Sequence, residues 1–165
     1  MLALDVDGTL TDGMIYIGPQ AEAMKAFSVR DGLGLSLLRQ SGLKLAIVTA
    51  RQSSIVEIRA AELGFDVVIQ SASDKATALR QLALQSELEV SEIAYMGDDW
   101  SDLPALSIAG LAAAPADATA PVLRASHWVS TRKAGQGAVR EFAEWLLECQ
   151  GRLQVLLEKY RTGGR

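Results

Sequence analysis

Cysteine and long hydrophobic runs are nearly absent from this chain of 165 residues. Its single cysteine, Cys149, excludes an internal disulfide and cannot by itself form a thiolate zinc site. Apolar runs such as residues 43–48, which Lys44 interrupts, and residues 110–114 are far shorter than the roughly 20 residues that span a bilayer. Residues 1–7 contain no basic segment followed by an apolar stretch. We therefore expect no export signal and a cytoplasmic location.

An excess of positive charge is absent as well. The chain has 16 Lys and Arg against 20 Asp and Glu, a net charge of −4 and a pI near 5.0. Without a general positive field, it is a poor candidate for binding nucleic acid. Its 49% hydrophobic and 22% charged residues are typical of a globular protein, and its length suits one domain. We expect a single domain over residues 1–165, with a mobile tail at about 162–165.

Short β-rich segments alternate with helix-patterned segments along the chain. This alternation predicts an α/β fold, with a Rossmann-like parallel sheet and helices on both of its faces. The predicted strands are residues 2–6, 44–48, 66–69, 92–96, 110–113 and 127–129. The predicted helices are residues 33–40, 53–63, 75–86, 103–108 and 139–147, and residues 152–160 form a further helix-like stretch.

One interval after the first predicted strand interrupts the alternation. Residues 14–17 and 24–28 are β-like, and Gly18-Pro19-Gln20-Ala21 separates them. Glycine and proline together between two such segments are typical of a turn. We therefore expect a β-hairpin flap over residues 13–28 that projects from the sheet.

Two carboxylates lie where the first predicted strand ends. Asp5 and Asp7 are two residues apart and precede Gly8, and this spacing puts both side chains on one face of a strand. Ligands of open α/β sheets bind at the carboxyl ends of the strands, so these acids are candidates for chemistry. The alternative is that both only form a turn, which is common for Asp beside Gly.

A second group of acids follows the fourth predicted strand. Asp98, Asp99 and Asp102 lie in the segment that begins at Gly97. Carboxylates within about 4–6 Å raise one another's pKa unless a cation joins them, and Mg²⁺ is a hard cation that prefers oxygen ligands. The two acidic segments together therefore predict a Mg²⁺ site. Asp99 could equally be the N-cap of the following helix.

Groups that suit a phosphoryl group follow the second and third predicted strands. Thr49 and Arg51 come after the second strand, and Lys75 begins a helix after the third. A hydroxyl and an ammonium can hold the equatorial oxygens of a transferring phosphoryl group. The simpler roles are a cap for the threonine and a solvated side chain for the lysine. A lysine is nevertheless poorly placed at the positive end of a helix dipole, which hints at an anionic partner.

In their order along the chain, these segments resemble the four motifs of the haloacid dehalogenase superfamily phosphatases. The matching residues are DVDGT at 5–9, Thr49, Lys75 and GDDxxD at 97–102. The resemblance implies that Asp5 is the nucleophile, which becomes an aspartyl phosphate, and that Asp7 is the general acid and base. It also implies that Thr49 and Lys75 bind the phosphoryl group.

The same resemblance implies a Mg²⁺ cofactor. Its protein ligands would be Asp5, Asp98 and the backbone carbonyl of Asp7. Asp102 would support the metal or Lys75 rather than react.

Within the superfamily, the chain is most similar to the capless family of 3-deoxy-D-manno-octulosonate 8-phosphate phosphatases. The similar segments are DGTLTDG at 7–13, FSVRDG at 27–32, TAR at 49–51 and KAGQGAVRE at 133–141, with Ala50 where the family usually has glycine. The similarity implies a phosphorylated sugar acid as substrate, with Arg30, Arg51 and Arg140 as its contacts. It also implies a homotetramer in which a neighbouring subunit completes each active site.

Three alternatives stay open at this point. A catalytically silent assembly domain would share the fold, although Asp5 and Asp7 are both present. A receiver domain would carry its phosphorylated aspartate on the third strand, which here ends in Gln70 and Ser71. A nonulosonate 9-phosphate is an alternative substrate, although Arg51 favours the eight-carbon sugar acid.

Overall fold

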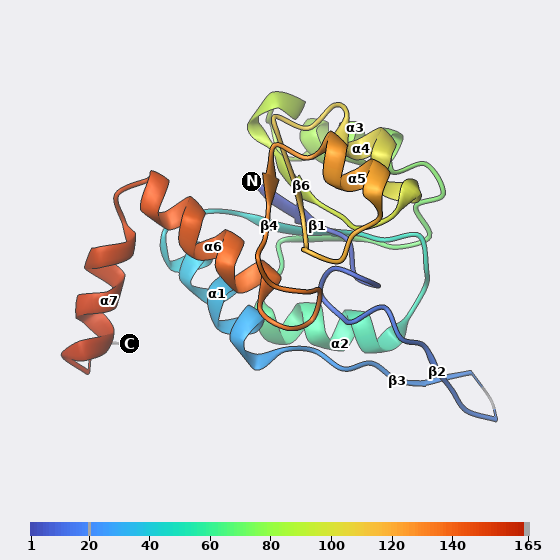
Figure 1. Ribbon diagram of the computed structural model, residues 1–165, viewed down its shortest axis with the longest axis horizontal. Coiled ribbons are helices and arrows are strands. Elements are labelled where there is room, and N and C mark those ends of the chain that lie inside the picture. The colour runs from blue at the N-terminus through green and yellow to red at the C-terminus, as the bar shows by residue number, and fades with distance from the viewer. Residues whose placement is uncertain (20, 164–165) are drawn as a thin grey trace.

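The computed structural model describes residues 1–19 and 21–163, and a parallel β-sheet forms its centre (Figure 1). The sheet has six strands in the order β5-β4-β1-β6-β7-β8, and every neighbouring pair is parallel. The strands are β1 (Leu2–Leu4), β4 (Leu45–Val48), β5 (Val67–Ile69), β6 (Ala94–Met96), β7 (Leu111–Ala114) and β8 (Trp128–Val129). The predicted α/β class is confirmed, although most strands are shorter than predicted.

Helices cover both faces of the sheet. They are α1 (Val29–Gln40), α2 (Ser54–Leu63), α3 (Lys75–Gln85), α4 (Leu103–Leu106), α5 (Ala120–Ala125), α6 (Ala138–Cys149) and α7 (Leu153–Arg161), with 3₁₀ turns η1 (Val90–Glu92) and η2 (Trp100–Asp102). Helix α1 begins four residues before the predicted start, because the Ser28 hydroxyl caps it by accepting a hydrogen bond from the amide of Asp31. Helix α5 escapes prediction because six residues are too few to show helical periodicity.

The hydrophobic core has two halves, one on each face of the sheet, and alternate residues of β1 contribute to each. Leu2 and Leu4 pack with residues of α1 and α6 on one face, whereas Ala3 packs with residues of α3 on the other. All three are fully buried, as expected for a parallel strand that is covered on both faces. The central strand therefore has little freedom to shift, and the loop that follows it starts from a fixed point.

The predicted hairpin forms β2 (Tyr16–Ile17) and β3 (Glu22–Met24), an antiparallel pair that projects from the sheet (Figure 1). The prediction of a second strand over residues 24–28 is wrong for residues 25–28, which follow β3 without regular structure. The pairing of the hairpin ends where Tyr16 faces Met24, so no strand is left for residues 25–28 to pair with, and Ser28 already caps α1. Gln20 of the predicted turn lies outside the described residues.

The C-terminal segment ends in α7, which packs on the core through its buried residue Leu156. Of the predicted mobile tail, Thr162 and Gly163 form a turn after α7, and residues 164–165 lie outside the described residues. Across residues 1–19 and 21–163, the helices are all too short or too polar to cross a membrane.

Candidate active site

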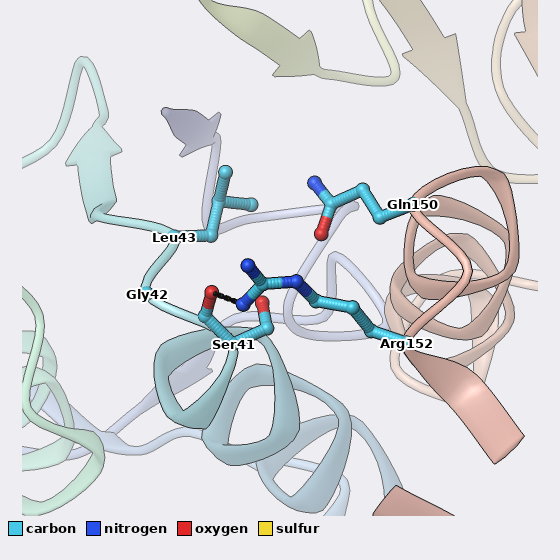
Figure 2. Close-up of a pocket in the computed structure, with 5 residues that line it drawn as sticks. All are labelled: Ser41, Gly42, Leu43, Gln150 and Arg152. Atoms are coloured by element: carbon cyan, nitrogen blue, oxygen red, sulfur yellow. Dashed lines mark hydrogen bonds between the residues drawn. The ribbon is translucent and has the colours of Figure 1, made fainter. Parts of the chain in front are cut away.

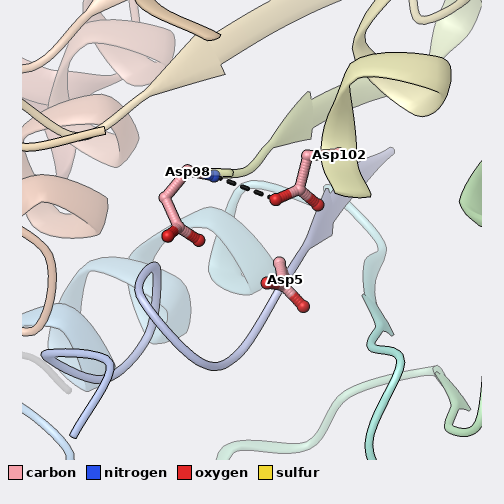
Figure 3. Close-up of side chains that lie close together, drawn as sticks. All are labelled: Asp5, Asp98 and Asp102. Atoms are coloured by element: carbon pink, nitrogen blue, oxygen red, sulfur yellow. Dashed lines mark hydrogen bonds between the residues drawn. The ribbon is translucent and has the colours of Figure 1, made fainter. Parts of the chain in front are cut away.

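Strand pairing brings the two acidic segments together. β1 lies between β4 and β6, and the amide of Asp5 donates a hydrogen bond to the carbonyl of Met96 over 3.0 Å. Each acidic segment therefore starts at the carboxyl end of a neighbouring strand. As a result, carboxylate oxygens of Asp5, Asp98 and Asp102 lie within 4.8 Å of one another (Figure 3).

Two glycines permit this close approach. Gly8 has a φ of +90°, and a Cβ atom there would lie 2.1 Å from Oδ2 of Asp98. A Cβ atom at Gly97 would lie 2.3 Å from Cγ of Asp102. Either atom would push a carboxylate out of the cluster, so the chemistry of the acids depends on the absence of these side chains.

Asp102 is fully buried and has a donor for each of its lone-pair positions. Its Oδ1 accepts hydrogen bonds from Nζ of Lys75 and from the hydroxyl of Tyr95, both at 2.6 Å. Its Oδ2 accepts from the amides of Asp98 (3.0 Å) and Asp99 (3.1 Å). These four bonds make Asp102 a support for Lys75 and for the loop, and they leave Asp5 and Asp98 as the better candidates for metal ligands.

Lys75 is the first residue of α3 and is 2% exposed. Besides Asp102, its Nζ contacts Oδ1 of Asp5 at 3.0 Å. Asp74 caps the same helix by accepting hydrogen bonds from the amides of Ala76 and Thr77. The carboxylates of Asp5 and Asp102 thus compensate the charge of Lys75, which would otherwise be poorly placed at a helix N-terminus.

The three carboxylates of this cluster carry more negative charge than the single ammonium of Lys75 compensates. Burial, followed by the charge of neighbouring carboxylates, raises the pKa of Asp5 to about 6 and that of Asp98 to about 7. Burial alone would lower the pKa of Lys75, but the charges of Asp5 and Asp102 outweigh it and the net pKa is raised. One ammonium among three carboxylates leaves excess negative charge, and oxygen donors of this kind suit a hard divalent cation.

The side chain of Asp7 lies apart from the other acids. Its Oδ1 pairs with the ammonium of Lys25, and its Oδ2 lies 3.4 Å from Nε of Arg51. Lys25 comes from the segment after β3, so the hairpin reaches back to the acidic loop. Of the predicted metal-binding residues, Asp7 therefore adds no carboxylate to the cluster of Asp5, and only its backbone carbonyl is a candidate ligand.

Thr49 lies at the same edge of the sheet as Asp5, because β4 pairs with β1. It is 2% exposed, and its amide donates a hydrogen bond to the carbonyl of Ile69 over 2.9 Å. Its carbonyl accepts from the amide of Ala72 at 3.0 Å. The backbone of Thr49 is therefore fixed by the loop that leads to Lys75.

The three predicted substrate-contact arginines lie in different places. Arg51 contacts Asp7, whereas Arg30 is exposed at the start of α1. Arg140 lies on α6, where Glu144 binds its guanidinium at 2.7 Å and 2.8 Å. Among the described residues, Arg51 is thus the only one of the three that pairs with an acid of the first loop.

The loop before α6 packs against its own chain rather than standing free. The amide of Gly135 donates a hydrogen bond to the carbonyl of Thr9 over 3.3 Å, and a Cβ atom at Gly135 would lie 2.7 Å from the amide nitrogen of Asp12. Asp31 accepts hydrogen bonds from the amides of Gly137 (3.3 Å) and Arg140 (2.7 Å). This segment, one of those that resemble the phosphatase family, supports the back of the first acidic loop.

Several residues of the site escape prediction from the sequence. Tyr95 reads only as a core residue, and no sequence pattern shows that its hydroxyl binds Asp102. Lys25 and Glu22 lie in a hairpin whose pairing register the sequence does not fix. Asp99, which could be a cap or a catalytic group, is a cap: its carboxylate accepts from the amide of Trp100 at 2.7 Å.

One surface hollow lies away from the acids. It has a volume of about 420 Å³ and lies between Ser41-Gly42-Leu43 and the end of α6 (Figure 2). This region precedes β4, so it is at the amino ends of the strands, opposite the acidic loops. Its only charged side chain, Arg152, already donates a hydrogen bond to the carbonyl of Ser41 (Figure 2). We therefore place the candidate site at the acids.

Comparison with known proteins agrees with this geometry. Residues 65–142 match the model of the haloacid dehalogenase-like hydrolases. The 3-deoxy-D-manno-octulosonate 8-phosphate phosphatase of Yersinia pestis is 41% identical over 154 residues, which cover 93% of this chain and 82% of that protein.

Solved structures give the same result. The Moraxella catarrhalis 3-deoxy-D-manno-octulosonate 8-phosphate phosphatase, crystallised with magnesium, phosphate and the sugar acid, superposes with a TM-score of 0.94 at 41% identity, covering 96% of this chain and 91% of that one. The cobalt-bound Haemophilus influenzae phosphatase superposes with a TM-score of 0.91 at 38% identity, covering 93% and 90% of the two chains.

Proposed function

Because this chain belongs to the haloacid dehalogenase-like hydrolases, within the family of 3-deoxy-D-manno-octulosonate 8-phosphate phosphatases, we propose that it releases phosphate from that sugar-acid phosphate. The enzyme class, a phosphatase, follows from the family, and Mg²⁺ is the cofactor of such phosphatases. The observation that carries the proposal is the convergence of Asp5, Asp98 and Lys75 at the carboxyl edge of the sheet.

The chain's own residues suit a reaction in two steps. In the first, a carboxylate oxygen of Asp5 attacks phosphorus; an Asp5–phosphorus bond forms, the ester bond breaks, and Asp7 gives its proton to the leaving alkoxide. In the second, Asp7 removes a proton from a water molecule, which attacks the aspartyl phosphate and releases phosphate and free Asp5. Lys75, 3.0 Å from Asp5, and Thr49 at the same sheet edge are placed to hold phosphoryl oxygens.

A bound Mg²⁺ would neutralise the crowded carboxylates and the charge of the transferring phosphoryl group. Asp5, Asp98 and the backbone carbonyl of Asp7 would hold it. The raised pKa values of Asp5 and Asp98 support this assignment, because burial first and the neighbouring carboxylates second disfavour the ionised forms, and Lys75 does not offset both.

The substrate assignment is tested with a panel of phosphate esters. We expect Mg²⁺-dependent phosphate release from 3-deoxy-D-manno-octulosonate 8-phosphate, weaker release from a nonulosonate 9-phosphate, and the weakest from neutral sugar phosphates. Arg51 supports the preference for a sugar acid, since its guanidinium suits a carboxylate and lies 45% exposed beside Asp7. Equal rates on neutral sugar phosphates would contradict the proposed substrate class.

The assembly that we propose is a homotetramer. The hairpin supports it, because Met14, Ile17 and Met24 are 60%, 81% and 58% exposed, an apolar surface that a neighbouring subunit would cover. In such an assembly, the exposed Arg30 of one subunit would lie close enough to contact the substrate in the active site of its neighbour. We expect Ile17→Asp to lower the mass measured by light scattering, whereas Ile58→Asp, a change at another well exposed isoleucine, on α2, should leave it unchanged. A monomeric unmodified protein would contradict the assembly.

A further inference from the structure

The hairpin buries a charge and exposes its apolar side chains. The side chain of Lys25 is only 1% exposed, whereas its neighbour Met24 is 58% exposed. Lysine is almost never fully buried unless it is paired, because removing an ammonium from water is costly. Hairpin stability alone would favour the opposite arrangement, so the position of Lys25 needs another explanation.

The buried ammonium of Lys25 binds two carboxylates. One is Oδ1 of Asp7, and the other is Oε1 of Glu22 at 2.8 Å. Asp7 belongs to the first acidic loop and Glu22 to β3. Lys25 thus connects the hairpin directly to the residue that we assign as the general acid and base.

Glu22 fixes this part of the hairpin to the rest of the chain. Its Oε2 accepts a hydrogen bond from the hydroxyl of Ser53 at 2.5 Å, and its Oε1 lies 3.5 Å from a terminal nitrogen of Arg51. Burial by itself would raise the pKa of Glu22. The hydrogen bonds from Lys25 and Ser53 outweigh this effect, so the net pKa is lowered. Glu22 is therefore an ionised anchor for Lys25.

The four charged residues form a closed ring in which cations and anions alternate: Asp7, Lys25, Glu22 and Arg51. Two of them come from the hairpin and two from loops at the carboxyl ends of strands. The ring holds the carboxylate of Asp7 on the hairpin side and away from Asp5, Asp98 and Asp102. A proton donor must keep such a separate position if it is to reach the leaving oxygen rather than the metal.

We propose that Lys25 is a positioning residue for Asp7, and this inference rests on the proposed role of Asp7 as general acid. Lys25 holds Oδ1 of Asp7, which leaves Oδ2 to carry the proton that passes to the leaving alkoxide as the ester bond breaks, and Asp7 then becomes the carboxylate of the ring. It acts through Asp7, so its removal should matter only where a proton must be delivered.

Two aryl phosphates without a carboxylate separate this role from substrate binding. Phenolate is a poor leaving group and needs a proton, whereas p-nitrophenolate leaves readily without one. For Lys25→Met, we expect kcat/KM for phenyl phosphate to fall by about 10- to 100-fold, less than the roughly 10²- to 10⁴-fold that general acid catalysis supplies, because Asp7 itself is still present. For p-nitrophenyl phosphate, the fall should be below about threefold by the same reasoning. Lys25→Arg should restore most of the loss.

Three control variants make the result specific. Asp7→Asn should show the same selectivity for the poor leaving group, and Lys25→Met should cause no further selective loss in that background. Lys159→Met, a change at an exposed lysine of α7, should alter neither rate. Thermal melting of each variant verifies that it folds, and Lys25→Gln replaces Lys25→Met if the latter does not.

The outcomes distinguish the two proposals. An equal loss on both aryl phosphates in the Lys25 variants, with a selective loss in Asp7→Asn, would overturn the role of Lys25 alone. An equal loss in Asp7→Asn itself would overturn the role of Asp7 as general acid, and the inference would fall with it.

Discussion

The acid cluster at the sheet edge and the hairpin ring hold their charges in different ways. Asp5, Asp102 and Lys75 are at most 6% exposed: Asp5 follows the fully buried strand β1, Asp102 lies in the turn η2 after β6, and Lys75 begins α3. The hairpin, by contrast, exposes most of its apolar side chains, and the ring of Asp7, Lys25, Glu22 and Arg51 connects it to the strand-end loops.

This difference indicates a division of labour. The core fixes the groups that must meet phosphorus and a cation, where small displacements are costly. The hairpin adds groups that orient a proton donor and face the substrate, and a few ion pairs are enough to place them. Changes in the cluster should therefore have large effects on turnover or on stability, and changes in the hairpin ring smaller and more selective ones.

Asp5→Asn should produce the largest effect. An amide cannot attack phosphorus as a carboxylate does, so we expect kcat to fall by about 10⁴-fold or more, as when a catalytic nucleophile is removed elsewhere. The measurement is phosphate release at saturating Mg²⁺. The metal-free variant should melt no lower than the unmodified protein, because it removes a carboxylate whose pKa is raised by burial and by Asp102. Retention of more than a few per cent of the activity would contradict the assignment of the nucleophile.

Asp102→Asn should produce the next largest effect, and mainly on stability. The amide cannot accept all four hydrogen bonds of the carboxylate, and it leaves the buried Lys75 with one partner fewer. Breaking a buried charge pair on one side costs about 3–5 kcal/mol, which urea unfolding would detect. The control is Asp117→Asn, at an exposed acid that accepts one amide hydrogen bond, from Ala134 at 2.9 Å. Similar losses in both variants would refute the special role of the Asp102 network.

The sequence predicts the cluster better than the hairpin, and the reason is physical. Asp5 and Asp98 follow apolar strands, and parallel strands must place their carboxyl ends at one edge, so their convergence follows from the order of the elements. The contact of Lys25 with Asp7 depends on the pairing register of β2 and β3, which is irregular between Tyr16 and Ile17 and is encoded by no alternating pattern. The cluster therefore follows from topology, whereas the ring depends on local packing.

Mg²⁺ binding tests the electrostatics of the cluster over the range of pH that its pKa values define. Without a cation, the pKa of Asp5 is about 6 and that of Asp98 about 7, and each must lose its proton to bind Mg²⁺. Affinity should be constant well above pH 7. Below pH 7 it should fall by about tenfold per pH unit, and more steeply below pH 6, where two protons compete. Calorimetric titration with MgCl₂ between pH 5.5 and 8.5 measures this. An affinity independent of pH would contradict the shared site.

Glu22→Gln should produce the smallest and most selective effect. Glutamine retains an acceptor for Ser53 but removes the charge that anchors Lys25, so Asp7 should lose part of its fixed orientation. We expect kcat/KM for phenyl phosphate to fall by about two- to fivefold, a small part of what general acid catalysis supplies. The loss of stability should be smaller than that of Asp102→Asn, because the side chain of Glu22 is 12% exposed whereas Asp102 is fully buried. Glu62→Gln provides the matched control, because Glu62 forms a surface ion pair with Arg59 at 2.8 Å away from the acids. Two results would contradict this expectation: an equal fall in kcat/KM for p-nitrophenyl phosphate, or a loss of stability as large as that of Asp102→Asn. Either would mean that the hairpin ring is a structural part of the core, and the contrast between the two regions would disappear.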